Sequence, residues 1–278
     1  MSYVEFYYTY IVWCCLCCLG GVVYFCASYF FGVLFSIITI LAVREYHHLV
    51  NSSSFHTIMS MIGGLMLFGT TWLWYNMGDL PLSSVAYLVL AYLLFSILVL
   101  VMGLFFEKRN PIQDWGNYFV SQSMVALPLA MMNIVYHHGQ YLLLALFVTI
   151  WLNDSGAYCV GSLMAKRKGG NHKMFPRVSP AKSWEGLIGG VLVSLLAGYV
   201  YAKLGWFGTE NAYVYALIFA FLVSVFGTLG DLMESLFKRT IGVKDSGKFM
   251  PGHGGVLDRF DSILLATPII AAFVMMFL

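Results

Sequence analysis

The chain has 278 residues, of which 60% are apolar and only 10% are charged. Soluble domains are about 45–50% apolar and about 25% charged, so the composition excludes an ordinary soluble domain and predicts a polytopic membrane protein. The formal net charge of +2 carries little information by itself, and the distribution of charge matters more. We expect a lipid bilayer around the chain and no nucleic-acid partner.

Apolar runs predict about nine membrane spans, since one span needs roughly 20 apolar residues. The first run, residues 6–43, is too long for one crossing and is divided near residues 27–29 into two helices. Its N-terminal part lacks a basic region and a cleavage site, so we expect a retained helix and not a signal peptide. The other spans are predicted at 57–77, 82–106, 117–136, 139–164, 184–204, 211–237 and 260–278. The predicted fold is an all-α polytopic membrane protein with about nine transmembrane helices.

The cysteines and histidines give no sign of a metal site. Five of the six cysteines lie in the first apolar run, with no His or Asp near them, and we expect packed or lipid-facing thiols. Two histidine pairs lie in predicted loops outside any ligand spacing, and we expect them to be solvated. These pairs are His47-His48 and His137-His138.

Lysine and arginine predict the orientation of the chain. With nine spans, 14 of the 15 basic residues fall on one side, and only Lys203 lies opposite. Basic residues concentrate in cytoplasmic loops, so we expect this side and its polar cavity to face the cytoplasm. The N-terminus is then inside and the C-terminus outside. The loops at 166–183 and 239–257 share the cytoplasmic face.

The end of the eighth predicted span carries a polar helical face. Asp231, Glu234, Ser235 and Lys238 are spaced so that they lie on one side of a helix. An aspartate as deep as Asp231 is costly unless it binds a cation or pairs with a base. The alternative is a Glu234–Lys238 pair that merely ends the span, although this leaves Asp231 unexplained.

A glycine-rich turn, residues 251–255, follows and leads to two closely spaced aspartates, Asp258 and Asp261, which flank Arg259. Glycine lets the backbone approach a ligand or another helix closely. Helix capping would explain one aspartate but not two with an arginine. For His253 we favour a role as a strut or a phosphate donor over the alternative of metal ligation. The hard carboxylate oxygens of the aspartates favour Mg²⁺ over zinc.

Two further segments carry polar residues, one inside a predicted span and one in the loop after it. Asp154, in the middle of a span, is a functional candidate, and the alternative is an interhelical hydrogen bond. In the following loop, Ser179 and Lys182 could donate to phosphates, and Trp184 could lie at the interface or stack on a base. Residues 166–173 are better explained by topology and attraction to anionic lipids.

Two common nucleotide-binding motifs do not occur in the chain. It has no GxxxxGK[ST] loop and no GxGxxG after a strand, which argues against P-loop and Rossmann binding.

Residues 235–261 resemble the signature of the phosphatidate cytidylyltransferases, also called CDP-diacylglycerol synthases. The match is specific, and Met250 is a mild departure from it. Segments 153–158 and 179–186 also resemble motifs of that family, with Ala181 and Ser183 where Lys and Thr are common. The matching signature reads Ser235-x-Phe237-Lys238-Arg239, Lys244-Asp245-x-Gly247, then Pro251-x-His253-Gly254-Gly255-x-x-Asp258-Arg259-x-Asp261.

The resemblance implies that CTP and phosphatidate react to give CDP-diacylglycerol and pyrophosphate, with Mg²⁺ required, in a homodimer. It implies metal ligation by Asp231 and Asp258, and we expect Asp261 and Asp154 to act nearby or on a second cation. The other expected catalytic residues are Lys238, Arg239, Lys244, Asp245 and Arg259. The expected substrate-binding residues are Ser179, Lys182, Trp184, Ser235, His253, Gly254 and Gly255.

The resemblance is good over about residues 150–278, and before that only hydropathy supports it. We expect a multi-pass protein of a bacterial inner membrane, with N-terminal helices in 1–136 and a catalytic region in 137–278. A CTP-dependent lipid kinase of the polyprenol or phytol type is the nearest alternative, and the signature argues against it. An ion-coupled transporter is another, but it predicts polar residues at both membrane faces.

Overall fold

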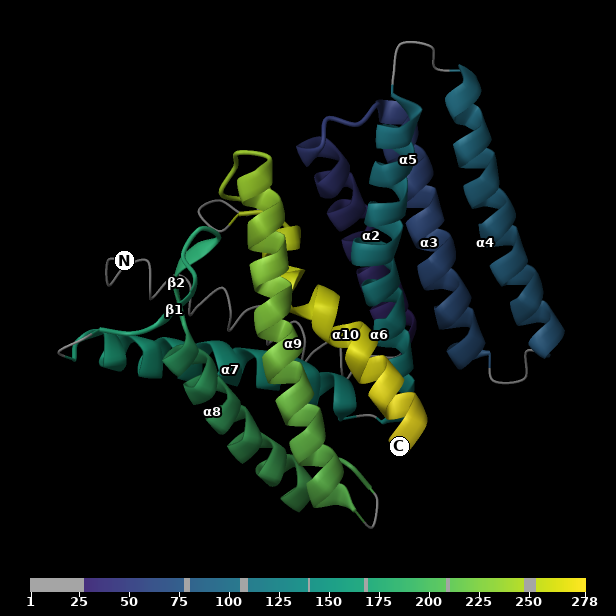
Figure 1. Ribbon diagram of the computed structural model, residues 1–278. Coiled ribbons are helices and arrows are strands. Elements are labelled where there is room, and N and C mark those ends of the chain that lie inside the picture. The colour runs from purple at the N-terminus through teal and green to yellow at the C-terminus, as the bar shows by residue number, and fades with distance from the viewer. Residues whose placement is uncertain are drawn as a thin grey trace.

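The computed structural model describes residues 28–77, 81–105, 110–139, 141–167, 170–208, 211–247 and 254–278. Within these residues, eight helices are long and apolar enough to cross a membrane (Figure 1). They correspond to eight of the nine predicted spans, which confirms the all-α polytopic fold. The predicted first span and its cysteines lie outside the described residues.

The helices follow the apolar runs of the sequence. Their bounds are α2 (Ser28–Leu49), α3 (Ser54–Asn76), α4 (Leu82–Met102), α5 (Pro111–Val120), α6 (Leu127–His138), α7 (Leu142–Ala165), α8 (Trp184–Lys203), α9 (Ala212–Thr240) and α10 (Leu257–Phe277). A 3₁₀ turn, η1 (Gly103–Phe105), extends α4, and a π-helical turn, η2 (Ser121–Ala126), joins α5 to α6. Pro128, at the start of α6, cannot donate a backbone hydrogen bond to the preceding turn, which fits a widened turn there.

Two helix ends differ from their predicted positions in a way that matters for the polar residues. Helix α9 continues to Thr240, beyond the predicted end at residue 237, and α10 begins at Leu257 instead of residue 260. Lys238 and Asp258 therefore lie on helices. Regular helix geometry fixes where their side chains point.

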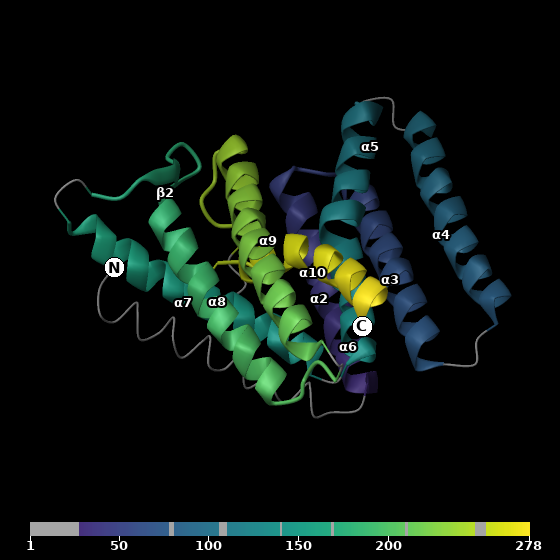
Figure 2. The same cartoon turned by 60° about the horizontal axis from the view of Figure 1, so that its bottom comes forward.

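The helices form two groups with α10 between them, and both ribbon views show this arrangement (Figures 1 and 2). One group contains α2–α6, and the other contains α7, α8 and α9. Small residues allow close packing in the second group: a Cβ at Gly198 on α8 would lie 2.7 Å from the carbonyl oxygen of Ala216 on α9. Such small residues are typical of helix contacts within membranes.

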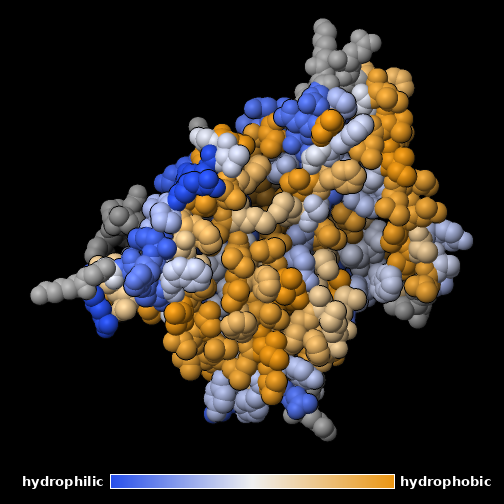
Figure 3. All heavy atoms as spheres, viewed as in Figure 1, coloured by the Kyte–Doolittle hydropathy of each residue, from blue (hydrophilic) through white to orange (hydrophobic). Residues whose placement is uncertain are grey.

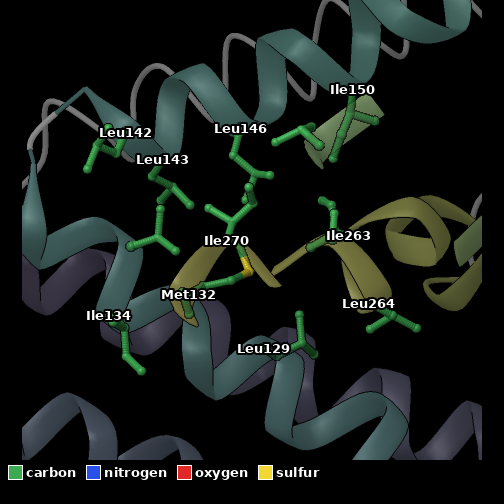
Figure 4. Close-up of a cluster of buried hydrophobic side chains, with 14 of the residues drawn as sticks. Leu129, Met132, Ile134, Leu142, Leu143, Leu146, Ile150, Ile263, Leu264 and Ile270 are labelled. Carbon is green, nitrogen blue, oxygen red and sulfur yellow. The ribbon is translucent and has the colours of Figure 1, made fainter. Parts of the chain in front are cut away.

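A cluster of buried hydrophobic side chains joins these groups. Leu129 and Met132 of α6, Leu146 of α7 and Ile270 of α10 meet in it, and all four are fully buried (Figure 4). The cluster connects the predicted N-terminal and C-terminal regions across the boundary at 136/137. That division of the chain stays a prediction.

A β-hairpin stands between α7 and α8, where the sequence analysis predicted a loop. Strands β1 (Lys173–Phe175) and β2 (Ser179–Ser183) are antiparallel, with Lys173 opposite Ser183. Ser183 ends the hairpin and caps α8, because its hydroxyl accepts a hydrogen bond from Gly186 N at 3.2 Å. The hairpin is thereby fixed in direction relative to α8.

Polar atoms gather along the upper left edge of the molecule, above an apolar belt (Figure 3). The hairpin and the C-terminal end of α9 lie along this edge (Figure 1). The edge therefore brings together the two segments that the sequence analysis expected at one membrane face.

The expected solvation of the histidines is wrong for His47, which is fully buried and bonds to Ser52 Oγ through Nδ1 at 2.8 Å. His137 is half-buried and bonds to Asn76 Nδ2 at 3.0 Å. His48 and His138 are exposed, as expected. Short loops and neighbouring helices cover the rings of His47 and His137, and sequence spacing does not reveal this burial.

Candidate functional site

An ion pair joins the hairpin to α9. Lys182 Nζ, near the end of β2, lies 2.5 Å from Asp231 Oδ2, and it also lies 3.4 Å from the carbonyl oxygen of Thr228. Ser235, one turn further along α9, donates to Asp231 Oδ1 at 3.3 Å. The Lys182 and Asp231 side chains are 23% and 30% exposed. Residues 49 positions apart in the sequence therefore meet at a partly open place.

A second and more buried ion pair joins α9 to α10. Lys238 Nζ lies 2.6 Å from Glu234 Oε2 and 2.5 Å from Asp258 Oδ1. The three side chains are only 7–12% exposed. The Glu234–Lys238 pair within α9 thus exists, as the simpler alternative predicted, but the same ammonium also binds a carboxylate of the next helix.

Asp258 also organises the glycine-rich segment before α10. Its Oδ2 accepts hydrogen bonds from Ser246 N at 2.9 Å and from Gly255 N at 2.8 Å. Gly254 has a φ of +79°, and a Cβ there would lie 2.3 Å from Asp258 Oδ2. Only glycine suits such a backbone and such a close approach. Asp258 therefore binds two backbone N–H groups and a cationic side chain at the same time.

Two more carboxylates lie within electrostatic reach of these pairs. Asp261 on α10 interacts with Asp231, Glu234 and Asp154, and Asp154 on α7 interacts with Asp231 and Lys182. Helices α9 and α10 approach closely here, since a Cβ at Gly230 would lie 2.7 Å from the carbonyl oxygen of Asp261. The interhelical hydrogen bonds expected as the alternative for Asp154 are made by its neighbour Asn153, to Ser224 and Thr228.

We define the acidic cluster as these five carboxylates together with three basic groups. Its members are Asp154, Asp231, Glu234, Asp258, Asp261, Lys182, Lys238 and Arg259. With all groups ionised, carboxylates outnumber bases by two. Excess negative charge beside a membrane is costly unless a cation compensates it or a carboxylate takes up a proton.

The acidic cluster fits a Mg²⁺ ion whose coordination is completed by other oxygens. Mg²⁺ is usually held by one or two carboxylates, with waters and substrate phosphates as the remaining ligands. Within the described residues, no three His, Cys, Asp or Glu side chains are arranged as a ready-made metal cage.

The other predicted site residues are mostly at the surface, and most of them are exposed. Arg239 is exposed and donates from Nη1 to the carbonyl oxygen of Val243 at 3.2 Å. Lys244 and Asp245 are exposed in the following turn, and Ser179 is half-buried in β2. Trp184 is 49% exposed on the first turn of α8. His253 lies outside the described residues.

One residue of the site was missed from the sequence. Glu45, near the end of α2, accepts hydrogen bonds from Ser246 Oγ, from Val256 N at 2.7 Å and from Leu257 N at 3.2 Å. The only available signal was a carboxylate near the end of an apolar run in a chain with few charges. Its partners lie about 200 positions away, so spacing could not identify them.

Comparison with known proteins identifies the family. The model of the "Cytidylyltransferase family" matches residues 8–277. A protein of Staphylococcus saprophyticus called "Phosphatidate cytidylyltransferase" is 37% identical over 197 residues, which cover 71% of this chain and 70% of that protein. Proteins of the same name from Staphylococcus haemolyticus and Haemophilus influenzae are 45% and 43% identical, over 48% and 49% of this chain and 48% and 46% of their own lengths. The chain therefore belongs to the cytidylyltransferase family.

Proposed function

We propose that this chain is a phosphatidate cytidylyltransferase, which transfers CMP from CTP to phosphatidate and releases pyrophosphate. The observation that carries the proposal is the acidic cluster, which unites the three segments that resemble the family's motifs. Lys182 comes from segment 179–186, Asp154 from segment 153–158, and Lys238 and Asp258 from the signature. Family membership and the names of the relatives support the same reaction.

The reaction depends on neutralising the negative charges of its two substrates more than on transferring a proton. A phosphate oxygen of phosphatidate attacks the α-phosphorus of CTP, and the bond from that phosphorus to the bridging oxygen of the β-phosphate breaks. Phosphatidate is already an anion at neutral pH, so little general-base help is needed. The difficulty is to bring two polyanions together, and fixed positive groups relieve it.

The basic residues of this chain suit that task. Lys182 and Lys238 are held at fixed positions by carboxylates, so their ammonium groups need little reorganisation. Arg259 lies beside Asp258 and Asp261 on α10. Arg239 is exposed at the end of α9, and Lys244 is exposed in the turn that follows. We assign phosphate binding to these five residues, with Ser179 and Trp184 near the nucleotide or the lipid head group.

Asp231 and Asp258 would hold Mg²⁺, with Asp154 and Asp261 nearby or on a second cation. When bound, such an ion would neutralise phosphate charge and stabilise the transition state. The carboxylates of the chain would orient the ion, and their present hydrogen bonds would keep them in place. Ser246 N and Gly255 N hold Asp258, and Ser235 holds Asp231.

The membrane setting suits a lipid substrate. Most of the acidic cluster lies in the last turns of α9 and the first turns of α10, so diacyl tails could stay in the bilayer while the head group meets CTP. We place this face in the cytoplasm, where CTP is found, and the protein in a bacterial inner membrane. The proposed homodimer rests on the family resemblance alone.

Product analysis tests the proposal. Purified protein is incubated with CTP, phosphatidate and Mg²⁺, and pyrophosphate and the lipid product are measured. A cytidylyltransferase releases pyrophosphate, whereas a CTP-dependent lipid kinase releases CDP. Release of CDP with a phosphorylated lipid would refute the assignment. Absence of both products, with ion flux in vesicles, would favour the transporter.

A further inference from the structure

Glu45 links the N-terminal helices to the loop that carries the signature. It is half-buried near the end of α2, and three donors converge on its carboxylate. Ser246 Oγ and Leu257 N donate to Oε1, and Val256 N donates to Oε2. Two of these donors are backbone groups at the start of α10, where N–H groups lack partners within the helix and the helix dipole favours a negative charge.

The glycines of the signature make room for this side chain. A Cβ at Gly255 would lie 1.8 Å from Glu45 Oε1, and a Cβ at Gly247 would lie 3.0 Å from Glu45 Cδ. Gly247 and Gly255 therefore both lie close against the carboxylate. Such a fit requires glycine at position 255, since no side chain could share that space.

Ser246 connects Glu45 to Asp258. The Ser246 hydroxyl donates to Glu45, and its oxygen accepts a hydrogen bond from Asp258 N at 3.3 Å. Ser246 N donates to Asp258 Oδ2 at 2.9 Å. Glu45 therefore binds Ser246, and Ser246 in turn binds both the backbone N–H and the carboxylate of Asp258.

We propose that Glu45 is a positioning residue for the cytidylyltransferase reaction: it fixes Ser246 and the start of α10, and thereby the place of Asp258. The inference rests on the proposed function. Glu45 itself touches neither substrate nor metal in this role. An ionised carboxylate suits the position because it can accept from all three donors, whereas an amide would turn its NH₂ group toward one or more N–H groups.

The experiment compares Glu45→Gln and Glu45→Asp with Arg44→Gln, which changes an exposed charge at the neighbouring position of the same helix. Pyrophosphate release is measured with CTP varied at saturating phosphatidate. Because a displacement of about 1 Å can cost about a hundredfold in rate, we expect Glu45→Gln to lower kcat about tenfold to a hundredfold. The KM for CTP should change less than threefold, and Arg44→Gln should keep both values.

Hydrogen exchange of the Val256 and Leu257 amides supplies a readout that needs no activity. Exchange should be at least tenfold faster in Glu45→Gln than in the wild-type protein, and Glu45→Asp should fall between them. If the wild type released no pyrophosphate, the proposed function would fail, whereas unchanged exchange would overturn the role of Glu45. Wild-type kcat in Glu45→Gln would overturn it as well.

A double-mutant cycle separates positioning from a general loss of stability. If Glu45 acts through Ser246, the Glu45→Gln/Ser246→Ala pair should lose no more than about threefold beyond the worse single variant. If the kcat losses of the two single variants multiply in the double variant, Glu45 and Ser246 act independently, and the proposal that Glu45 acts through Ser246 is overturned. Should Glu45→Gln fail to fold, the same cycle is run with Glu45→Asp, and its exchange and kcat decide in the same way.

Discussion

Replacing Asp258 by Asn is the most informative perturbation of the acidic cluster. The amide has almost the shape of the carboxylate but no charge. Asp258 accepts from Lys238 through Oδ1 and from two backbone N–H groups through Oδ2. An amide has one oxygen, so its NH₂ group must face either the ammonium or the N–H pair. At least one of these contacts becomes repulsive.

The cost to stability follows from burial and from the partners that remain. Removing one member of a buried ion pair costs about 3–5 kcal/mol when it strands the other charge. Lys238 is only 10% exposed, but it keeps Glu234 at 2.6 Å. Its charge is therefore still paired, and the loss resembles that of a charge-assisted hydrogen bond, about 1.5–3 kcal/mol. We expect the variant to insert and fold with a reduced melting temperature.

The expected cost to activity is larger. If Asp258 holds Mg²⁺ between two polyanionic substrates, losing its charge should lower kcat at least about a hundredfold. The assay is pyrophosphate release by purified protein over a range of Mg²⁺ concentrations, with thermal unfolding measured in parallel. Leu264→Ala on the same helix is the matched control, because Leu264 is buried and its truncation costs about 2–5 kcal/mol in soluble proteins.

Leu264→Ala should lose stability while each folded molecule keeps its activity. Near-wild-type turnover by Asp258→Asn at limiting Mg²⁺ would refute the metal role of Asp258. An equal loss of activity in Leu264→Ala would show that instability alone accounts for the effect.

Three further predictions address other parts of the molecule. Lys182→Ala should lower kcat/KM for CTP at least about tenfold and Lys182→Arg should restore it only in part, because guanidinium and ammonium geometries differ; wild-type values in both variants would refute a role in CTP use. In a background without native cysteines, single cysteines in 166–183 and in 239–257 should react with an impermeant thiol reagent only after the inner face is exposed; labelling of intact cells would overturn the topology. Gly255→Ala should destabilise the protein by about 1–3 kcal/mol, because its Cβ would meet Glu45 Oε1, and adding Glu45→Ala should recover part of that loss.

The membrane helices were predictable because hydropathy is a property of local sequence. Eight predicted spans recur within the described residues, with shifted ends. The ends at Thr240 and Leu257 were misplaced because polar residues normally mark the end of a span. Here Lys238 and Asp258 neutralise each other across two helices, so both helices continue into the polar segment.

The candidate site was predictable where its residues share a helix or a motif. Spacing placed Glu234 and Lys238 on one face, and they form an ion pair. The β-hairpin was not predicted, because its short strands lie in a basic segment without alternating apolar residues. The contact between Lys182 and Asp231 needed tertiary structure, since topology could place both at one face but could not pair them.

Glu45 shows why a sequence motif alone does not identify every residue of its site. A glycine-rich turn indicates that something approaches the backbone closely, and the sequence left open whether that is a ligand or another helix. In the structure, a side chain from α2 takes this place at Gly247 and Gly255. The signature then has two physical tasks, which are to present Asp258 and to fit around a carboxylate from a distant helix. A change at Gly255 would therefore affect the acidic cluster through Glu45 and Ser246, as well as through the hydrogen bond from Gly255 N to Asp258.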